Sequence, residues 1–368
     1  MPLEGTLCAM LHALHYFPLG GGLTTANHLI DRLLNEKTYA IFDGGKSLAE
    51  GVKSLPALCF ELVSEQKKAW LDLREGYESL KNLRERYVYC KGFSVRFQHN
   101  PGRIKSSLAG VAKKNENERK CFLCLDHLPQ GQKGILYRGQ YLVLCNPMPV
   151  LSFQFTVAHL DHREQAIAEN MDAFSQLMDD LGSGWTVLYN GPKCGASAPD
   201  HHHFHAAPSG QMPIEKEIRE LKRLTLIRKV DGVTLYRVRD VGREIIILEG
   251  DDRMAMESAL KNYLKALKKV LLIDEEPMIN IAGFYKDSHW EEGKWRLVTF
   301  PRRKHRPDAF FKEGNDRIVV SPGVIEMAGV LVTPLEKDFE RLDGATVESI
   351  YEEISLEGET VERVIDAM

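Results

Sequence analysis

The chain lacks two features that would direct it to a membrane. No apolar run approaches the length of about 18 residues that a transmembrane helix needs. Residues 1–8 carry no basic segment of the kind that opens a secretory leader. We therefore expect a cytoplasmic protein that does not engage a membrane.

Neither sign of charge dominates the composition. The formal net charge is −4, and 27% of the residues are charged against 43% hydrophobic. Binding to nucleic acid usually needs a basic excess, so we do not expect nucleic acid as a partner. At 368 residues the chain is long enough for two domains with their own cores.

Cysteine is scarce, and the number of cysteines is odd. Their positions lack the even count and spacing of a disulfide framework. We expect reduced thiols, some of them in a metal site. The seven cysteines are Cys8, Cys59, Cys90, Cys121, Cys124, Cys145 and Cys194.

What the chain has in abundance is histidine at residues 201–205, where four of five positions are histidine. Side chains alternate between faces in a strand, so His201, His203 and His205 would share one face, opposite His202 and Phe204. Neutral imidazole can serve as metal ligand, general base or nucleophile. The alternative is an exposed histidine tract that binds metal adventitiously.

The residues before the histidines favour a phosphate site. Gly195, Ala196 and Ser197 form a turn of small residues, whose backbone N–H groups and hydroxyl can approach a phosphate closely. Asn190 ends the apolar run 185–189 and adds an amide donor. Together these residues make an adventitious metal tract the weaker interpretation.

Residues 190–205 resemble the signature Asn…Gly-(Ala/Cys)-Ser-x-Pro-His-x-His-x-Gln of the galactose-1-phosphate uridylyltransferase branch of the histidine-triad (HIT-like) superfamily. This branch also holds the diadenosine tetraphosphate phosphorylases and the GDP-hexose phosphorylases. Its middle histidine attacks the α-phosphorus of a nucleotide and forms a nucleotidyl-histidine. The resemblance implies that His203 is the nucleophile and that His205 and Ser197 assist it. It also implies nucleotide or phosphate binding by Asn190, Gly195, Ala196 and Ser197.

The chain departs from this signature at two positions. His205 stands where the transferases have glutamine, as in the hydrolytic histidine-triad proteins. Asp200 is an extra residue before the first histidine, so an ungapped alignment would make His202 the nucleophile. That register places Phe204 in the glutamine slot, where a phenyl ring cannot hydrogen-bond phosphate. We therefore predict His203.

The pair Cys121 and Cys124 has three interpretations from its spacing alone: buried thiols, a redox pair, or half of a zinc site. In the resembled family a Cys-x-x-Cys is completed by two histidines. The resemblance therefore implies a structural zinc held by Cys121, Cys124, His162 and His201. His159 is the rival to His162 as a ligand, and two reduced thiols without metal are the alternative to the site.

The hydrophobic spacing predicts the elements around these motifs. A long helix is predicted from Ser64, with apolar residues continuing to Tyr87, and another at 165–181, closed by Gly182. Strands are predicted at 92–98, 141–147 and 153–159, and a charged helix opens at Pro213 and runs to Arg228. After the turn at 100–102, Arg103 and Lys105 could hold phosphates or be solvated.

The C-terminal part repeats this order without a histidine triad. Strands are predicted at 232–238, 243–248, 280–285 and 295–301, with a helix at 254–271; the last strand takes the place of a second triad strand. The resemblance implies an α+β fold of two HIT-like halves, each an antiparallel sheet with packed helices, plus an N-terminal helical extension. We predict an extension at 1–63, a catalytic domain at 64–230 and a degenerate second domain at 231–368.

Three functions remain open. The first is a nucleotidylyltransferase or phosphorylase that takes a nucleoside diphosphate sugar or dinucleoside polyphosphate, with phosphate or a sugar phosphate as acceptor. The second is a histidine-triad hydrolase, in which water is the acceptor. The third is a zinc-stabilised protein that binds nucleic acid or another partner through the basic run 302–306, which is otherwise a solvated edge or a phosphate-binding segment. The resembled enzymes include dimers, so a homodimer is compatible with the resemblance.

Overall fold

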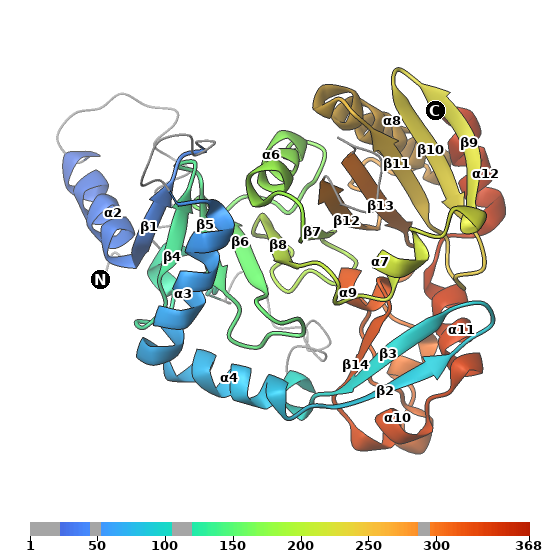
Figure 1. The fold of residues 1–368 in the computed structure, drawn as a ribbon, viewed down its shortest axis with the longest axis horizontal. Coiled ribbons are helices and arrows are strands. Elements are labelled where there is room, and N and C mark those ends of the chain that lie inside the picture. Colours follow the sequence, from blue (N-terminus) through green and yellow to red (C-terminus); the bar gives the residue numbers. More distant parts are fainter. Residues whose placement is uncertain (1–22, 45–52, 105–119, 286–294) are drawn as a thin grey trace, which may run out of the picture.

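The computed structural model describes residues 23–44, 53–104, 120–285 and 295–368. Most of its strands belong to one 11-stranded sheet that runs through the molecule (Figure 1). From one edge to the other, its strands are β1 (Thr38–Phe42), β4 (Gly134–Tyr137), β5 (Tyr141–Cys145), β6 (Phe155–His159), β8 (His203–Pro208), β7 (Trp185–Asn190), β12 (Ile279–Tyr285), β13 (Trp295–Pro301), β11 (Ile246–Gly250), β10 (Val233–Val238) and β9 (Leu224–Val230).

The large sheet consists of two halves with the same topology. In chain order, β4, β5, β6, helix α6 (Met171–Leu181), β7 and β8 are matched by β9, β10, β11, helix α8 (Arg253–Leu271), β12 and β13. Across the sheet, the first half has the strand order β4-β5-β6-β8-β7 and the second half has the equivalent order β9-β10-β11-β13-β12. The two halves meet where β7 and β12 pair antiparallel. The predicted α+β fold of two similar halves is confirmed, and β13, which has no histidine, occupies the place of β8.

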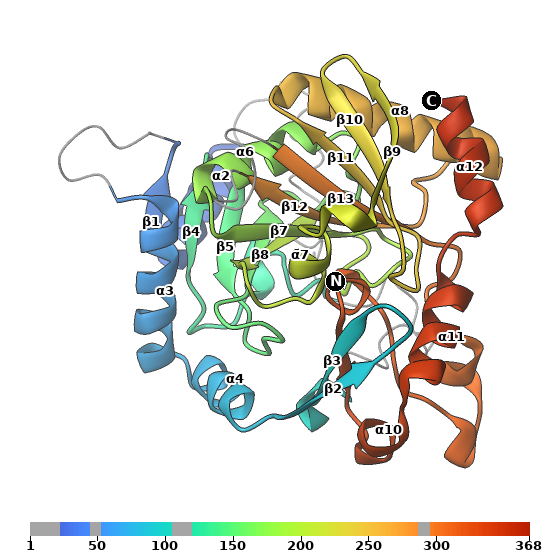
Figure 2. The ribbon, with the colours of Figure 1, turned by 45° about the vertical axis from the view of Figure 1, so that its right-hand side comes forward.

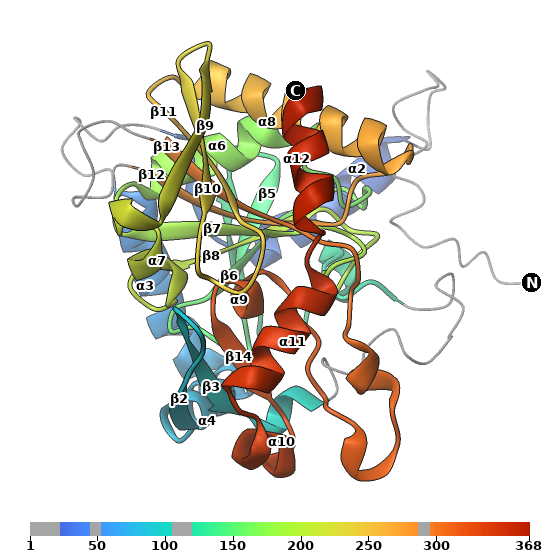
Figure 3. The same ribbon diagram turned by 90° about the vertical axis from the view of Figure 1, so that its right-hand side faces the viewer.

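Helices cover one face of the large sheet, and a small sheet with short helices covers the other (Figures 2 and 3). On the first face, apolar residues of the sheet pack with those of α3 (Leu55–Ala69), α6, α8 and α12 (Gly358–Ala367). On the second face they pack against a three-stranded sheet of β14 (Val330–Thr333), β3 (Ser94–His99) and β2 (Arg84–Tyr89), with α7 (Ile214–Glu217), α9 (Val324–Met327), α10 (Glu336–Arg341) and α11 (Gly344–Ile354). The remaining helices are α2 (Leu23–Lys37) and α4 (Leu71–Lys81).

The predicted long helix from Ser64 to Tyr87 is wrong. The backbone of Trp70 is extended, with φ −124° and ψ 110°, and separates α3 from α4. Tyr87 lies in β2 and is exposed. The apolar spacing misled because Trp70, Leu73 and Tyr77 are all buried although they belong to a break and a second helix.

The predicted charged helix from Pro213 to Arg228 is also wrong. Only Ile214–Glu217 is α-helical; a short 3-10 helix follows at Leu221–Arg223, and the chain then forms the edge strand β9. Glu217 is buried beside Arg243 rather than facing solvent, with a closest N–O distance of 3.4 Å. The helix predicted at 165–181 begins later, at Met171, but it ends as predicted at Gly182, whose φ is +71°.

The division into three domains stays a prediction. Residue 63 lies inside α3, while residue 230 ends β9 at the turn into β10. From the N-terminal segment, α2 and β1 are described, and β1 pairs parallel with β4. No helix in the described ranges has the length and hydropathy to cross a membrane.

A buried ion pair joins two strands of the second half. Arg296 on β13 lies opposite Glu249 on β11, its Nε donates to Glu249 Oε2 over 2.7 Å, and its Nη1 donates to the carbonyl of Ile218 over 2.9 Å. Their side chains are only 5% and 7% exposed. Replacing Arg296 alone would leave a carboxylate in the protein interior without its charged partner.

We expect Arg296→Met to lower the free energy of unfolding, measured by urea titration, by about 3–5 kcal/mol. The double variant Arg296→Met/Glu249→Met should recover most of the loss, because no charge then stays buried. Arg237→Met is the matched control: its partner Glu244 is more exposed, so we expect a loss of about 1 kcal/mol or less. Equal losses in Arg296→Met and Arg237→Met would contradict the prediction.

Candidate active site

Strand β8 places the histidines in the middle of the first half of the sheet. Its neighbours are β6 and β7, with Ala158 opposite His203 and Thr156 opposite His205. Phe204 packs in the core on the helix-covered face, so His203 and His205 point to the opposite face. Their rings lie 5.1 Å apart and nearly perpendicular. His201 precedes the strand instead of continuing it.

The hydrogen bonds of His203 determine its tautomer. Its Nδ1 lies 2.8 Å from the backbone carbonyl of His201. A carbonyl can only accept, so Nδ1 carries the proton and Nε2 carries the free lone pair. Burial lowers the pKa of His203 to about 4, and the ring is therefore neutral at pH 7. A neutral imidazole with one nitrogen held and the other free is the form that acts as a nucleophile.

His205 lies close to this ring, and Arg103 acts electrostatically on His205. Burial lowers the pKa of His205 to about 3, and the charges of His203 and Arg103 act in the same direction. The Nδ1 of His205 is 3.3 Å from the hydroxyl of Thr156. Arg103, in the short 3-10 helix η1 (Pro101–Arg103), donates to the carbonyl of Met148 over 2.9 Å and interacts electrostatically with Glu326. Lys105 lies outside the described residues.

His202 occupies the core on the other face. It packs against Tyr141 and Phe204, with ring centroids 6.0 and 4.7 Å away. Neither of its ring nitrogens has a hydrogen-bond partner among the residues that the structure describes. Burial lowers the pKa of His202 to about 2. This environment gives His202 no access to the face of His203, and it favours the register that makes His203 the nucleophile.

The four predicted metal ligands lie together. The ligand atoms of Cys121, Cys124, His162 and His201 are all within 4.8 Å of one another. The Sγ of Cys121 is 3.3 Å from His201 Nδ1, and the Sγ of Cys124 is 3.2 Å from His162 Nδ1 and 3.7 Å from His201 Nδ1. A tetrahedral zinc with ordinary bond lengths sets sulfur and nitrogen about 3.6 Å apart, so the cluster fits a zinc ion.

Hydrogen bonds behind the cluster orient its ligands. His201 Nε2 donates to the carbonyl of His159 over 2.8 Å, so the unprotonated Nδ1 faces the cysteines, and His162 Nε2 faces the carboxylate of Asp200 at 3.4 Å. Hydrogen bonds from Cys124 and His201 lower the pKa of Cys121 to about 3, which favours a thiolate. His159 has its Nε2 3.1 Å from Arg163 Nη1, so it is His162 that faces the cysteines.

The small-residue turn packs against the second half of the chain. Gly195 has φ +103°, and a Cβ there would come within 2.5 Å of the Cα of Gly323, so only glycine is accommodated. Ala196 is half-buried, and Ser197 is exposed at the turn. Asn190 Oδ1 accepts from Asn280 Nδ2 over 2.8 Å and from the Val324 N–H over 2.7 Å. The amide group of Asn190 therefore joins the halves, and only its Nδ2 is a candidate donor to phosphate.

Sequence reasoning missed the residues that hold this end of the site. Arg302 is 1% exposed, and its Nη1 donates to Asn280 Oδ1 over 2.7 Å and to the carbonyl of Pro322 over 3.1 Å. The interpretation of residues 302–306 as a solvated edge is therefore wrong for Arg302, and also for the buried Arg306. In the sequence, Arg302 and Arg306 are visible as parts of a run of basic residues. Such a run looks the same whether its side chains are solvated or buried.

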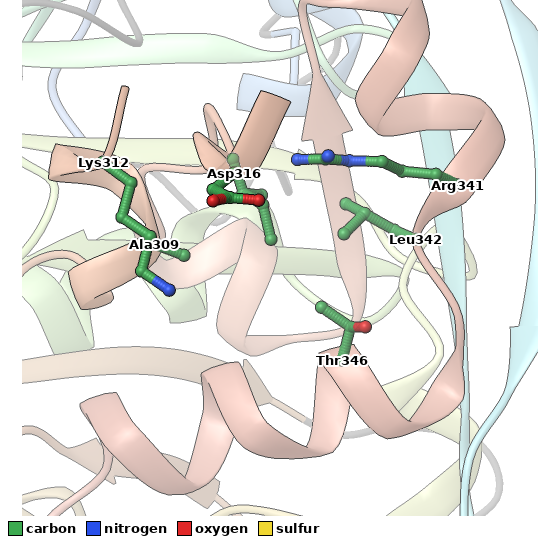
Figure 4. Close-up of a pocket in the computed structure, with 7 residues that line it drawn as sticks. Ala309, Lys312, Asp316, Arg341, Leu342 and Thr346 are labelled. Atoms are coloured by element: carbon green, nitrogen blue, oxygen red, sulfur yellow. The ribbon is translucent and has the colours of Figure 1, made fainter. Parts of the chain in front are cut away.

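The pocket drawn in Figure 4 lies apart from β8. Its lining comes from the segment 309–318 and from α10, α11 and the turn between them. None of the predicted site residues lines it. The lining residues are Ala309, Lys312, Asp316, Ile318, Arg341, Leu342 and Thr346.

One family model and several solved structures match this chain. The family described as a domain of unknown function, DUF4922, matches residues 62–208, which include the cysteine pair and the histidine strand. No curated protein sequence matches the chain.

Several solved structures match this chain, among them two of one enzyme. The structure of yeast Ap4A phosphorylase is 13% identical, with a TM-score of 0.52, and the match covers 83% of this chain and 95% of that one. The same enzyme in complex with Ap4A is 12% identical, with a TM-score of 0.52 and coverage of 81% and 97%. A uridylyltransferase mutant is 12% identical, with a TM-score of 0.33 and coverage of 57% and 88%.

The likeness to yeast Ap4A phosphorylase shows that the two proteins share a fold. It spans nearly all of that enzyme and both halves of the large sheet in this chain. The predicted resemblance to this branch is therefore confirmed at the level of the fold.

The unpartnered imidazole of His202 leads to a stability prediction. Buried polar atoms without a hydrogen bond cost free energy, so His202→Leu, of similar volume, should raise the free energy of unfolding by about 1 kcal/mol. His159→Leu, in the same cluster, should lower it because it breaks the contacts with Arg163 and Asp161. Urea titrations of both variants test the prediction, and a clear loss of stability in His202→Leu would contradict it.

Proposed function

We propose that this protein is a nucleotidyl-transferring enzyme that works through a covalent nucleotidyl-His203. The observation that carries the proposal is the hydrogen bond from His203 Nδ1–H to the carbonyl of His201, which leaves the Nε2 lone pair free. The fold shared with Ap4A phosphorylase supports it. So does the place of His205 on β8, beside His203, together with the positive charge of Arg103 that acts on His205.

The reaction has two displacements at phosphorus. In the first, the Nε2 lone pair of His203 attacks the α-phosphorus, a P–N bond forms, and the P–O bond to the rest of the substrate breaks, with the electron pair leaving on that oxygen. The ring gains positive charge, which the carbonyl of His201 stabilises through Nδ1–H. In the second, an acceptor oxygen attacks the same phosphorus and the P–N bond breaks, which restores neutral His203.

Several groups of this chain can stabilise the charge that develops on the phosphate oxygens. Arg103 supplies a cation near His205. The turn at Gly195, Ala196 and Ser197 supplies backbone N–H groups and an exposed hydroxyl, and Asn190 offers its Nδ2. Transfers of this kind depend mainly on positioning and electrostatics, so donors held by the fold before the substrate arrives are effective.

The proposed substrates are dinucleoside polyphosphates or nucleoside diphosphate sugars, with phosphate or a sugar phosphate as acceptor. The fold neighbour is an Ap4A phosphorylase whose structures include complexes with Ap4A and with AMP. Both substrate classes present an α-phosphorus with a phosphate leaving group, which the proposed chemistry requires.

A hydrolase is the second candidate, and one observation favours it. His205 occupies the place of the transferase glutamine and lies 5.1 Å from His203, centroid to centroid. A neutral imidazole can accept a proton from water, whereas an amide cannot. A binding protein that uses residues 302–306 is less well supported, because Arg302 is buried, Arg303 pairs with Glu357, and Lys304 pairs with Asp308 and Glu353.

We also propose that the Cys121, Cys124, His162 and His201 cluster binds zinc with a structural role. Four protein ligands fill a tetrahedral zinc and leave no position for water or substrate. Such an ion would hold the start of the histidine segment to the loop after β6. The ion would then hold the imidazole of His201, while the backbone carbonyl of His201 accepts the hydrogen bond from His203 Nδ1–H.

The test of the covalent step is intact-protein mass spectrometry. Wild-type protein is incubated with a donor panel of diadenosine polyphosphates and UDP-, GDP- and ADP-sugars. We expect one donor or more to add a nucleoside monophosphate, and phosphate to remove it. His203→Gly should lose the adduct completely, because it removes the imidazole whose Nδ1–H is held by the His201 carbonyl and whose Nε2 would attack phosphorus.

His202→Leu is the matched control and should keep the adduct. An adduct in His203→Gly but not in His202→Leu would reverse the register of the nucleophile. An adduct that decays as fast in water as with phosphate would favour the hydrolase. Complete absence of an adduct in folded wild-type protein, with every donor, would overturn the covalent mechanism.

Metal analysis tests the zinc proposal. We expect about one zinc ion per chain in protein purified without added metal, and little in Cys124→Ser. The same variant should unfold at a temperature about 5–10 °C lower, because metal binding contributes to folding. Cys90→Ser, in a half-buried cysteine outside the cluster, should change neither quantity. A metal content near zero in stable wild-type protein would reject the proposal.

A further inference from the structure

The ladder between β7 and β8 stops just before it reaches His203. The N–H of Ser209 donates to the carbonyl of Gly184 over 2.8 Å, and the ladder continues from Trp185 opposite Pro208 to Leu188 opposite His205. Hydrogen-bonded pairs alternate along an antiparallel ladder. Counting from the bonded pair Gly184 and Ser209, the next bonding position after Leu188 and His205 would join Asn190 to His203.

A side chain occupies that position instead. The Oε1 of Gln165 accepts the N–H of His203 over 2.8 Å. The Nε2 of Gln165 donates to the carbonyl of His203 over 3.0 Å and to the carbonyl of Asn190 over 2.9 Å. Gln165 is 3% exposed, so these are interior contacts. Its carboxamide thus takes the place of a strand partner between β7 and β8.

Glutamine suits this position chemically. Gln165 contacts one N–H donor and two carbonyl acceptors of the two strands, and a neutral carboxamide supplies one acceptor and two donor hydrogens. A thioether of the same length would leave all three backbone groups without a partner, and a carboxylate would face two carbonyls. The preference therefore comes from hydrogen bonding and not from size.

The segment that carries Gln165 is itself held on both sides. The N–H of His202 donates to the carbonyl of Arg163 over 2.7 Å, and the N–H of Ile167 donates to Glu276 Oε2 over 2.6 Å. Glu276 also contacts the hydroxyl of Tyr189 on β7. Gln165 therefore projects from a backbone that is fixed to the histidine segment and to the segment before β12.

We infer that Gln165 is a positioning residue that sets the backbone of His203, and so the direction of its Nε2. By taking the place of β7 at this point, Gln165 holds the peptide of His203 in position. The hydrogen bond from Nδ1–H to the His201 carbonyl then sets the tautomer of His203. Gln165 sets the backbone position from which the imidazole side chain projects. This role rests on the proposed nucleotidyl-His203 chemistry.

The experiment measures the rate of nucleotidyl-enzyme formation in Gln165→Met. The donor is the panel member that gives the largest adduct with wild-type protein, and it is used at a saturating concentration. Rapid-quench mass spectrometry then gives the rate constant of adduct formation and its amplitude, which is the fraction of enzyme that carries the adduct. We expect the rate constant to fall about 100-fold, as for a misplacement of about 1 Å, while the amplitude stays near that of wild type. A loss of folded protein alone would lower the amplitude and leave the rate constant unchanged.

Gln66→Met is the matched control. Gln66 is also buried, and its Oε1 likewise accepts a backbone N–H, that of Lys133, over 2.8 Å, but it lies on α3 and does not contact β8. It should keep the wild-type rate constant. If Gln165→Met does not fold, Gln165→Glu, which retains an acceptor for the His203 N–H, is measured in the same way with the same expectation of a slower rate.

The outcomes separate the two proposals. An unchanged rate constant in a folded Gln165 variant, or a loss of amplitude only, overturns the positioning role and leaves the covalent mechanism intact. Absence of an adduct in wild-type protein with every panel donor overturns both. A slow variant with full amplitude, next to a normal Gln66→Met, supports the inference.

Discussion

Partnering of buried polar groups is the constraint on which this site depends. The ends of β7 and β8 lie in the protein interior, where every N–H and carbonyl needs a partner. Gln165 hydrogen-bonds the carbonyl of Asn190 and the N–H and carbonyl of His203, and Asn280 donates to Asn190 Oδ1. Arg302 in turn donates to Asn280. Removal of any of these groups would leave a buried polar atom unpaired next to the candidate nucleophile.

The second half, which has no histidine on β13, contributes side chains to this network. The two halves meet at β7 and β12, and the second half supplies Asn280, Arg302 and the close approach of Gly323 to Gly195. It also supplies Glu276, which holds the segment of Gln165. The first half carries the imidazoles, and the second half determines where the strand ends and the small-residue turn lie.

Sequence reasoning succeeded where one local rule decides the outcome. Alternation along a strand separated His203 and His205 from Phe204, and the family resemblance named the four side chains, Cys121, Cys124, His162 and His201, that lie together. It failed where contacts between distant segments determine the secondary structure or the burial of a residue. The apolar spacing continued through Trp70, although the extended backbone there ends a helix, and the charges after Pro213 looked solvated, although Glu217 is buried beside Arg243.

The sequence alone therefore determined the chemical groups of the site and the face of the strand on which they lie, because residue type and the two-residue period of a strand are local properties. Only the tertiary structure decided which nitrogen of His203 is free, that His162 faces the cysteines, and that Gln165 and Arg302 belong to the site. Those facts depend on hydrogen bonds between segments far apart in the chain. No local pattern records such contacts, since they exist only once the two halves have packed together.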